Sequence, residues 1–436
     1  MIALLLGTCC ASALCAVRRP AVWLGLGLVT AMLPVGVTRS WLAALGPFAT
    51  VPPAVWVFLA GTATILLSEH RTVPRVTRLL LITTVTSVTA SLGTVFVVHG
   101  TSAAGSLFVL WILPIAGFVA LVAATTGRDV DVFVMTAPTV VTLALGESLF
   151  AIAQRVAGNG LLFEEYRSAA AQFGRTGRST GTFDTPLDLA AFLTLALTVA
   201  VRDRHPLRMW CATVVVAVGT VCSGSRTGMV LTVGVVALTL AVRGTRRIAD
   251  LLLASSVTVA AALAGSSAWA QQYFTRFGDG GDRSAWARDL ARDTGFRLVE
   301  SRPLTGSGLE YSYEYALANL PSSFEDAWLS LAIGAGLPVT AMLLALPVGV
   351  SVLPGPPALV IRATALITLI WGFSYSAYTA TSTFGVLAWT FLGLCASGLH
   401  HARTQRVEAD RRQGASDAPA LTGSIEPTLR AGHHAR

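Results

Sequence analysis

The sequence is divided into apolar blocks, each about twenty residues long, which is the length of helix that crosses the hydrocarbon core of a bilayer. Short segments that carry arginine separate these blocks. Of the 436 residues, 53% are hydrophobic and 12% are charged, so the chain lacks the polar residues that an ordinary water-exposed globular protein needs. The pattern therefore predicts an all-α fold, a polytopic bundle of transmembrane helices.

We expect about 12–13 helices in this bundle, between residues 1 and 400. Residues 2–17 also fit the apolar region of a signal sequence, but no small-residue cleavage site with a polar segment follows, so we count them as a helix. A large loop at 271–325 is inserted in the bundle, and the polar segment 401–436 is predicted to be a disordered cytoplasmic tail. The expected helices are 2–17, 21–36, 48–67, 79–99, 105–125, 131–153, 186–201, 208–223, 228–242, 249–270, 326–353, 357–376 and 381–399.

The distribution of arginine predicts the orientation of the bundle. Arginines occupy alternate short loops, for example at Arg71, Arg128 and Arg243, and by the positive-inside rule these loops are cytoplasmic. The intervening loops, including 154–185 and 271–325, then lie outside and carry arginines against the usual bias. We therefore expect a protein of the cytoplasmic membrane whose functional residues lie on the extracytoplasmic side.

Arg226 is the arginine whose position most needs an explanation. It stands between two apolar blocks, and a guanidinium that cannot lose its charge is costly beside lipid unless an anion or water meets it. Upstream, Arg178 precedes a helix that begins at Pro186, for which Asp184 or Thr185 can serve as N-cap. A helix N-terminus with arginine beside it attracts an anion, although an ordinary cap in a solvated basic loop would give the same pattern.

The outer loop carries a segment of mixed charge followed by aromatic residues. Arg288 and Arg292 lie four residues apart, as do two aspartates, which predicts a short surface helix. Tyr311 and Tyr313 suit either the apolar faces of sugars or the aromatic belt of the membrane interface. Trp328 is a third sugar-binding candidate, although for this residue we favour the belt.

Four short motifs follow one another in the chain. They are RSTGTFDTP at 178–186, SRTG at 225–228, PLTGSG at 303–308, and EDAWL at 325–329 ahead of Gly336-Leu337. In order, sidedness and spacing these motifs resemble those of the O-antigen ligase and O-antigen polymerase family of bacterial membrane glycosyltransferases. The resemblance covers roughly residues 175–340.

The resemblance implies a glycosyltransferase of cell-surface polysaccharide biosynthesis that uses no cofactor and no metal. Such an enzyme transfers or polymerises glycan from an undecaprenyl-diphosphate-linked donor to a hydroxyl of a glycan or glycolipid acceptor, among membrane lipids and without nucleic acid. Fixed arginines would stabilise the negative charge that grows on the leaving diphosphate. The expected diphosphate-binding residues are Arg178, Arg226, Arg288 and Arg283.

Glu325 and Asp326 stand where the family has a histidine and an asparagine. A carboxylate can take a proton from a sugar hydroxyl, particularly where burial raises its pKa. The predicted catalytic residues are therefore Glu325, Asp326 and Arg226, with His99 as a further candidate base. The two carboxylates can equally cap the helix that begins near Ala327, and in that case the acceptor or mechanism differs from the family pattern, or activity is lost.

Two other assignments stay open on the sequence alone. A transporter or flippase for lipid-linked oligosaccharides would also have an arginine-lined cavity, but such proteins usually show internal repeats, and we find none. A structural partner in envelope assembly would function without the outer arginines. A metal site is not expected, because the spaced pair Asp129 and Asp131 falls in a loop assigned to the cytoplasm.

Overall fold

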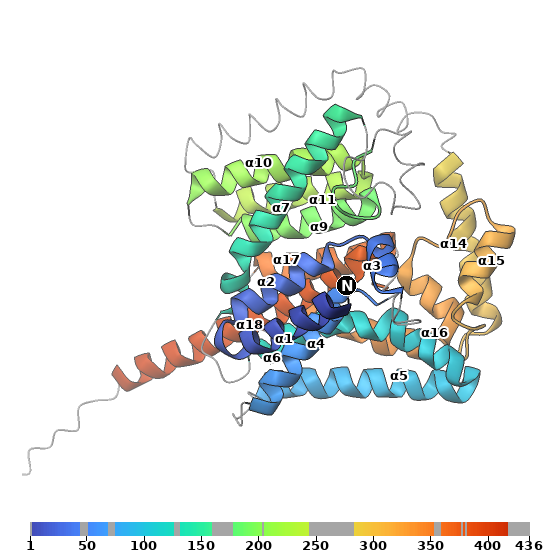
Figure 1. Cartoon of the computed structure of the whole chain (residues 1–436), viewed down its shortest axis with the longest axis horizontal. Coiled ribbons are helices and arrows are strands. Elements are labelled where there is room, and N and C mark those ends of the chain that lie inside the picture. The colour runs from blue at the N-terminus through green and yellow to red at the C-terminus, as the bar shows by residue number, and fades with distance from the viewer. Residues whose placement is uncertain are drawn as a thin grey trace, which may run out of the picture.

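The structure is a computed structural model, and it describes residues 2–43, 51–68, 75–125, 131–158, 178–202, 205–243, 283–352, 359–375, 378–379 and 382–416. Within these residues every regular element is a helix (Figure 1), which confirms the all-α bundle. Of the described stretches, four are long and apolar enough to cross a membrane: Arg78–Ala124, Val132–Ala157, Pro206–Ser223 and Ala327–Val352.

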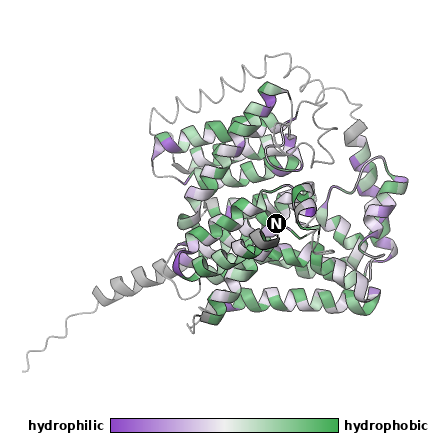
Figure 2. Ribbon diagram, viewed as in Figure 1, coloured by the Kyte–Doolittle hydropathy of each residue, from purple (hydrophilic) through white to green (hydrophobic). Residues whose placement is uncertain are grey.

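Shorter apolar helices complete the bundle. Figure 2 shows hydrophobic residues along its helices, while hydrophilic residues gather on the helices of the outer loop and at helix ends. The elements are α1 (Ile2–Arg18), α2 (Pro20–Ala31), α3 (Val35–Trp41), α4 (Pro53–Ser68), α5 (Arg75–Leu107), η2 (Phe108–Ile112), η3 (Leu113–Ile115), α6 (Ala116–Ala124), α7 (Val132–Ala157), α9 (Pro186–Ala200), α10 (Pro206–Ser223), α11 (Arg226–Arg243), α14 (Arg283–Ser301), α15 (Tyr311–Asn319), α16 (Ala327–Val352), α17 (Leu359–Ser374) and α18 (Thr383–Ser416).

The central helix of the bundle is α9. All of its residues except Leu187 are buried, and it contacts α7, α10, α11, α17 and α18. A helix that is apolar around its whole circumference belongs in an interior of this kind. Because interiors are close-packed, these neighbours hold the N-terminus of α9 in place.

The sequence predicts that one helix ends at residue 99 and the next begins at residue 105, and a break is found there. Two helices of α5 (Arg75–Leu107) meet at Gly100, which has non-helical angles (φ 83°, ψ −174°), but residues 101–104 are helical and form no loop. Glycine has no Cβ, so it adopts this conformation at little steric cost, and the small residues of 101–106 then resume the helix. A π-turn and a 3₁₀ turn containing Pro114 lead on into α6.

The expected boundary at residue 400 is also displaced. The helix α18 continues to Ser416, through residues 401–416 of the segment predicted to be disordered. These residues are rich in alanine, arginine and glutamine, which are good helix formers, and they contain no proline. The helix expected at 2–17 is α1, which packs on α2 and α4. Residues 417–436 and the helix expected at 249–270 lie outside the described residues.

The helix α16 is broken at Gly336, where φ is 85° and ψ is 165°. The PLTGSG loop satisfies the backbone groups that the break leaves open. The amide of Ser307 donates to the carbonyl of Ile333 at 2.8 Å, and the amide of Leu337 donates to the carbonyl of Pro303 at 2.8 Å. Backbone groups inside a membrane bundle require such partners, and the loop that supplies them begins directly after α14. The break in α16 therefore fixes the end of α14.

Candidate active site

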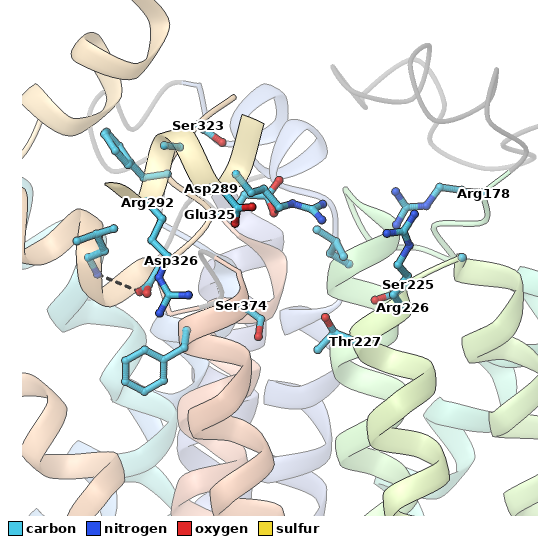
Figure 3. A pocket seen from close by; sticks show the side chains of 17 residues that line it. Arg178, Ser225, Arg226, Thr227, Asp289, Arg292, Ser323, Glu325, Asp326 and Ser374 are labelled. Atoms are coloured by element: carbon cyan, nitrogen blue, oxygen red, sulfur yellow. Dashed lines mark hydrogen bonds and ion pairs between the residues drawn. The ribbon is translucent and has the colours of Figure 1, made fainter. Parts of the chain in front are cut away.

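A cavity of about 750 Å³ lies where α9, α11, α14 and α17 approach the segment that precedes α16 (Figure 3). It brings together arginines and carboxylates that are far apart in the sequence. Arginines outnumber carboxylates in its lining, so the cavity favours an anion. The charged lining residues are Arg178, Arg226, Arg288, Arg292, Asp289, Glu325 and Asp326.

The turn between α10 and α11 places Arg226 at this cavity. After α10 ends at Ser223, Gly224 takes a left-handed conformation with φ 65°, and α11 begins at Arg226. The hydroxyl of Ser225 accepts a hydrogen bond from the amide of Gly228 at 3.1 Å and so caps the helix. The SRTG motif thus builds a helix N-terminus whose first residue is arginine, and both the helix dipole and the guanidinium are positive there.

Arg178 is held on the same turn. Its Nε donates to the carbonyl of Ser223 at 3.0 Å, and the amide of the next residue, Ser179, donates to the carbonyl of Cys222 at 3.0 Å. Figure 3 shows the side chains of Arg178 and Arg226 lying close together on one wall of the cavity. Because the bond to Ser223 engages Nε, it fixes the direction in which the planar guanidinium points.

Two polar side chains of α7, which the sequence analysis did not single out, fasten the segment after Arg178. Gln154 accepts from the amide of Gly181 at 2.9 Å and donates to the carbonyl of the same residue at 3.0 Å. Glu147 accepts from the amide of Thr182 at 2.8 Å and from its hydroxyl at 2.7 Å. Both are buried, and their spacing of two helical turns is the signal that could have identified them.

Thr185 is the N-cap of α9. Its hydroxyl accepts from the amide of Asp188 at 3.1 Å. Asp184, the other candidate cap, instead accepts from the amide of Val35 at 3.0 Å and from the hydroxyl of Thr383 at 2.7 Å. These bonds tie the entrance of α9 to α3 and α18, so the wall that carries Arg178 is attached to the rest of the bundle.

The opposite wall comes from α14 and the segment before α16. Nε of Arg288 lies 2.7 Å from a carboxylate oxygen of Glu325, and the two side chains are 47% and 28% exposed. An ion pair this exposed contributes little to stability, so its importance lies in the local charge arrangement. Arg292 also lines the cavity, one turn further along α14. The sequence showed its spacing from Arg288 but gave it no binding role.

Asp326 caps α16. Its Oδ1 accepts from the amides of Trp328 and Leu329, both at 2.9 Å. Burial raises the pKa of Asp326, while the hydrogen bonds from these amides and the charge of Arg292 act to lower it. Of the two alternatives left open by the sequence, capping is therefore the geometry found for Asp326, whereas Glu325 is paired with α14.

The sugar-binding candidates do not line this cavity. Trp328 is 2% exposed and packs between Trp111 and Tyr378, with tilted rings whose centroids are 5.8 and 4.9 Å away. Tyr311 and Tyr313 lie on α15, and the side chain of Tyr313 is exposed. Within the described residues, the aromatic side chain that reaches the cavity from the outer loop is Phe324.

The remaining candidates are not among the described lining residues. Arg283 begins α14, and its side chain is outside the described residues. The ring of His99 contacts the carbonyl of Thr305 in the PLTGSG loop. Among the residues that the structure describes, no group of three or more histidine, cysteine, aspartate or glutamate side chains could hold a metal ion.

Comparison with known families gives a match to part of the chain. Residues 211–344 match the family model described as O-antigen ligase. This segment is similar to the O-antigen ligase family. The O-antigen ligase segment runs from α10 into α16 and contains Arg226, Arg288, Glu325 and Asp326, whereas Arg178 precedes it. A comparison with curated proteins gave no match.

The family match supports glycan transfer of the O-antigen ligase type by a membrane protein. Inside the O-antigen ligase segment, the start of α11 contributes a fixed positive charge on one wall, and on the opposite wall an arginine of α14 pairs with a carboxylate. Such a site can bind a phosphorylated group and can bring a carboxylate near it.

Proposed function

We propose that this chain transfers a glycan from an undecaprenyl-diphosphate donor to a hydroxyl of a glycan or glycolipid acceptor, on the outer face of the cytoplasmic membrane. The supporting observation is that Arg178 and Arg226 on one wall and Arg288 and Arg292 on the other line a single cavity. Planar guanidiniums bind phosphate oxygens through paired hydrogen bonds, and several of them around one cavity suit a diphosphate better than a single phosphate.

The proposed reaction breaks the bond between the anomeric carbon of the donor sugar and a diphosphate oxygen. That carbon forms a new bond to the acceptor oxygen, and the diphosphate leaves with the electron pair of the broken bond. Negative charge therefore grows on the leaving group, and fixed guanidiniums stabilise it more in the transition state than in the bound donor. Arg226 combines its side chain with the positive end of α11.

The acceptor hydroxyl must lose a proton, and Glu325 is the proposed base. Asp326 is less suited, because its carboxylate oxygen already accepts two amide hydrogen bonds of α16. The ion pair with Arg288 holds the carboxylate of Glu325 at the cavity. When the donor diphosphate engages Arg288, it competes with Glu325 for the guanidinium and leaves the carboxylate to accept the proton.

The outer location is inferred from the charges at the two ends of α9 and α10. Arg202 and Arg208 lie where α9 connects to α10, and the cavity lies at the opposite ends of both helices. Since arginine-bearing short connections are retained in the cytoplasm, the cavity would open on the other side.

The function can be tested by deleting the protein from its cells and restoring wild type, Arg226→Ala or Arg302→Ala. Arg302 is an exposed arginine of the outer loop, directly after α14, and it does not line the cavity, so it serves as the matched control. Wild type and Arg302→Ala should restore the surface glycan, and Arg226→Ala should not, at equal membrane abundance. Shorter glycan chains in the deletion strain would indicate a polymerase, and accumulated full-length lipid-linked glycan would indicate a ligase. Undiminished glycan with Arg226→Ala would refute the proposal.

A vesicle assay separates transfer from transport. Purified protein in vesicles with a lipid-diphosphate glycan and an acceptor should release lipid diphosphate and form a new glycosidic bond. Movement of intact donor across the bilayer without bond cleavage would identify a flippase instead.

A further inference from the structure

A second cavity, of about 990 Å³, lies at the opposite ends of α9 and α10 from the arginine-lined cavity. The helix α9 contributes Leu187 to the first cavity and Val199 and Ala200 to the second. Twelve residues of α-helix separate Leu187 from Val199, a rise of about 18 Å at ~1.5 Å per residue. The second cavity is therefore separate from the proposed transfer site.

The lining of this second cavity is mostly apolar and lies between α7 and α10. On α7 the side chains recur along one face, from Val134 through Ala137 and Val141 to Leu145. On α10 they continue from Met209 to Val215. Val134 is 59% exposed although it is apolar, as expected where lipid replaces water around a membrane helix.

One end of this apolar groove is basic. Arg202, His205 and Arg208 all line it, and they are grouped where α9 connects to α10. The guanidinium of Arg202 lies over the ring of Phe133, 4.4 Å from its centroid. Among the residues that the structure describes, the lining includes no carboxylate, and Asp131 is the N-cap of α7, where its side chain accepts from backbone amides.

We propose that this groove binds one anionic glycerophospholipid, with an acyl chain between α7 and α10 and the headgroup phosphate at Arg202, His205 and Arg208. The occupant follows from charge complementarity, since the groove joins an apolar channel to a cluster of cations. The bilayer is already as apolar as the groove, so the lining positions the chain while the basic end selects a negative headgroup. This inference depends on membrane insertion and not on glycan transfer.

The test is native mass spectrometry of the full-length protein in detergent, titrated with phosphatidylglycerol or phosphatidylcholine of the same acyl chains. Phosphatidylglycerol should bind several-fold more tightly. Arg208→Gln should weaken phosphatidylglycerol binding about fivefold, the contribution expected from one arginine near an anionic headgroup, and leave phosphatidylcholine binding unchanged. Arg78→Gln is the matched control, because Arg78 is an exposed arginine of α5 that does not line the groove.

A second pair of variants tests the groove without changing charge. Thr142→Trp fills the groove from an exposed position in its lining, whereas Leu207→Trp adds the same ring at a 70% exposed position of α10 outside the lining. Thr142→Trp should abolish the preference for phosphatidylglycerol, and Leu207→Trp should retain it. Equal binding of the two lipids by wild type, or unchanged phosphatidylglycerol binding in both Arg208→Gln and Thr142→Trp, would overturn the proposal. So would tighter binding of undecaprenyl phosphate than of phosphatidylglycerol at the same residues.

Discussion

The guanidinium Nε of Arg288 lies 2.7 Å from a carboxylate oxygen of Glu325, so a candidate phosphate ligand and the candidate base are paired with each other. The pair joins α14 to the segment that begins α16, and its side chains remain partly exposed to the cavity. An anion that binds Arg288 must compete with Glu325. Donor binding and release of the base are therefore coupled through one contact.

Glu325→Gln should separate these two roles. Transfer should fall by about a hundredfold or more, because general base catalysis contributes on that scale. Donor binding should stay equal or become tighter, because the amide no longer neutralises Arg288. Initial rates and donor binding are measured separately, with Asp289→Asn as a control that removes a neighbouring cavity carboxylate. Normal turnover by Glu325→Gln would show that Glu325 is not the base and that it only forms the ion pair with Arg288.

Arg178→Lys should impair donor use although the charge is kept. Lysine cannot reproduce the bond from Nε to the Ser223 carbonyl while also presenting a planar group to phosphate. Loss of one hydrogen bond to a charged group, worth ~1.5 kcal/mol or more, corresponds to a decrease in kcat/KM of about tenfold or more. Arg302→Lys, outside the cavity, should behave as wild type. Equal rates for the two lysine variants would show that Arg178 acts only as a charge.

Substitutions of Asp326 distinguish its role as the cap of α16 from a role as the general base. Asp326→Ala should lower the free energy of unfolding by about 1 kcal/mol, because two amides of α16 lose their acceptor. Asp326→Asn keeps an acceptor oxygen and should restore both stability and transfer. If Asp326→Asn is as stable as wild type but inactive, the carboxylate takes part in the chemistry. Thermal unfolding in detergent and initial rates distinguish these outcomes.

The pH dependence of stability should carry the signature of the same residue. Burial raises the pKa of Asp326 above its unfolded value, so between the two values the folded protein binds more protons than the unfolded chain. The contribution of the Asp326 carboxyl to the free energy of unfolding is therefore present at low pH and is lost as pH rises through its pKa in the folded protein. Wild type should lose stability relative to Asp326→Asn over that window, and parallel curves for the two proteins would contradict this.

The motifs predicted that Arg178, Arg226 and Arg288 lie together, and local sequence explains the position of Arg226. A glycine turn and a serine cap place Arg226, and the resemblance to one family supplied the order of the motifs. The pairing of Glu325 with Arg288 was not predictable, since it depends on how the broken helix α16 receives the loop after α14. A hydropathy pattern does not predict an ion pair between residues that are far apart in the sequence.

The polar residues of α7 show the same limit. Glu147 and Gln154 read as isolated polar positions in an apolar helix, and their partners lie about thirty residues away in a segment without regular structure. The break at Gly100 was predictable from the sequence, but its length was not. A single glycine with positive φ separates the two helices of α5, so residues 101–104 are helical where a loop was expected.

Glu147→Ala should impair transfer although Glu147 does not line the cavity. The amide and hydroxyl of Thr182 lose their acceptor, at a cost of ~1–3 kcal/mol, and the segment that positions Arg178 loosens. Glu147→Gln should recover part of both stability and kcat/KM. Gly146→Ala is the matched control, because a Cβ there meets open space. Full activity of Glu147→Ala would show that Arg178 is positioned without Glu147.

Gly336→Ala should disconnect the PLTGSG loop from α16. At φ 85° an L side chain costs ~1–3 kcal/mol, and the added Cβ would also press on the carbonyl of Leu304. Gly349→Ala, in the same helix with open space around it, should leave stability unchanged or raise it slightly. Thermal unfolding and transfer rates are measured for both. The loop fixes the end of α14, so Gly336→Ala should also displace α14 from the cavity. Transfer should therefore be lower than in wild type even at a temperature where wild type and Gly336→Ala are both folded. Wild-type transfer by a folded Gly336→Ala protein would mean that α14 is held at the cavity without this junction.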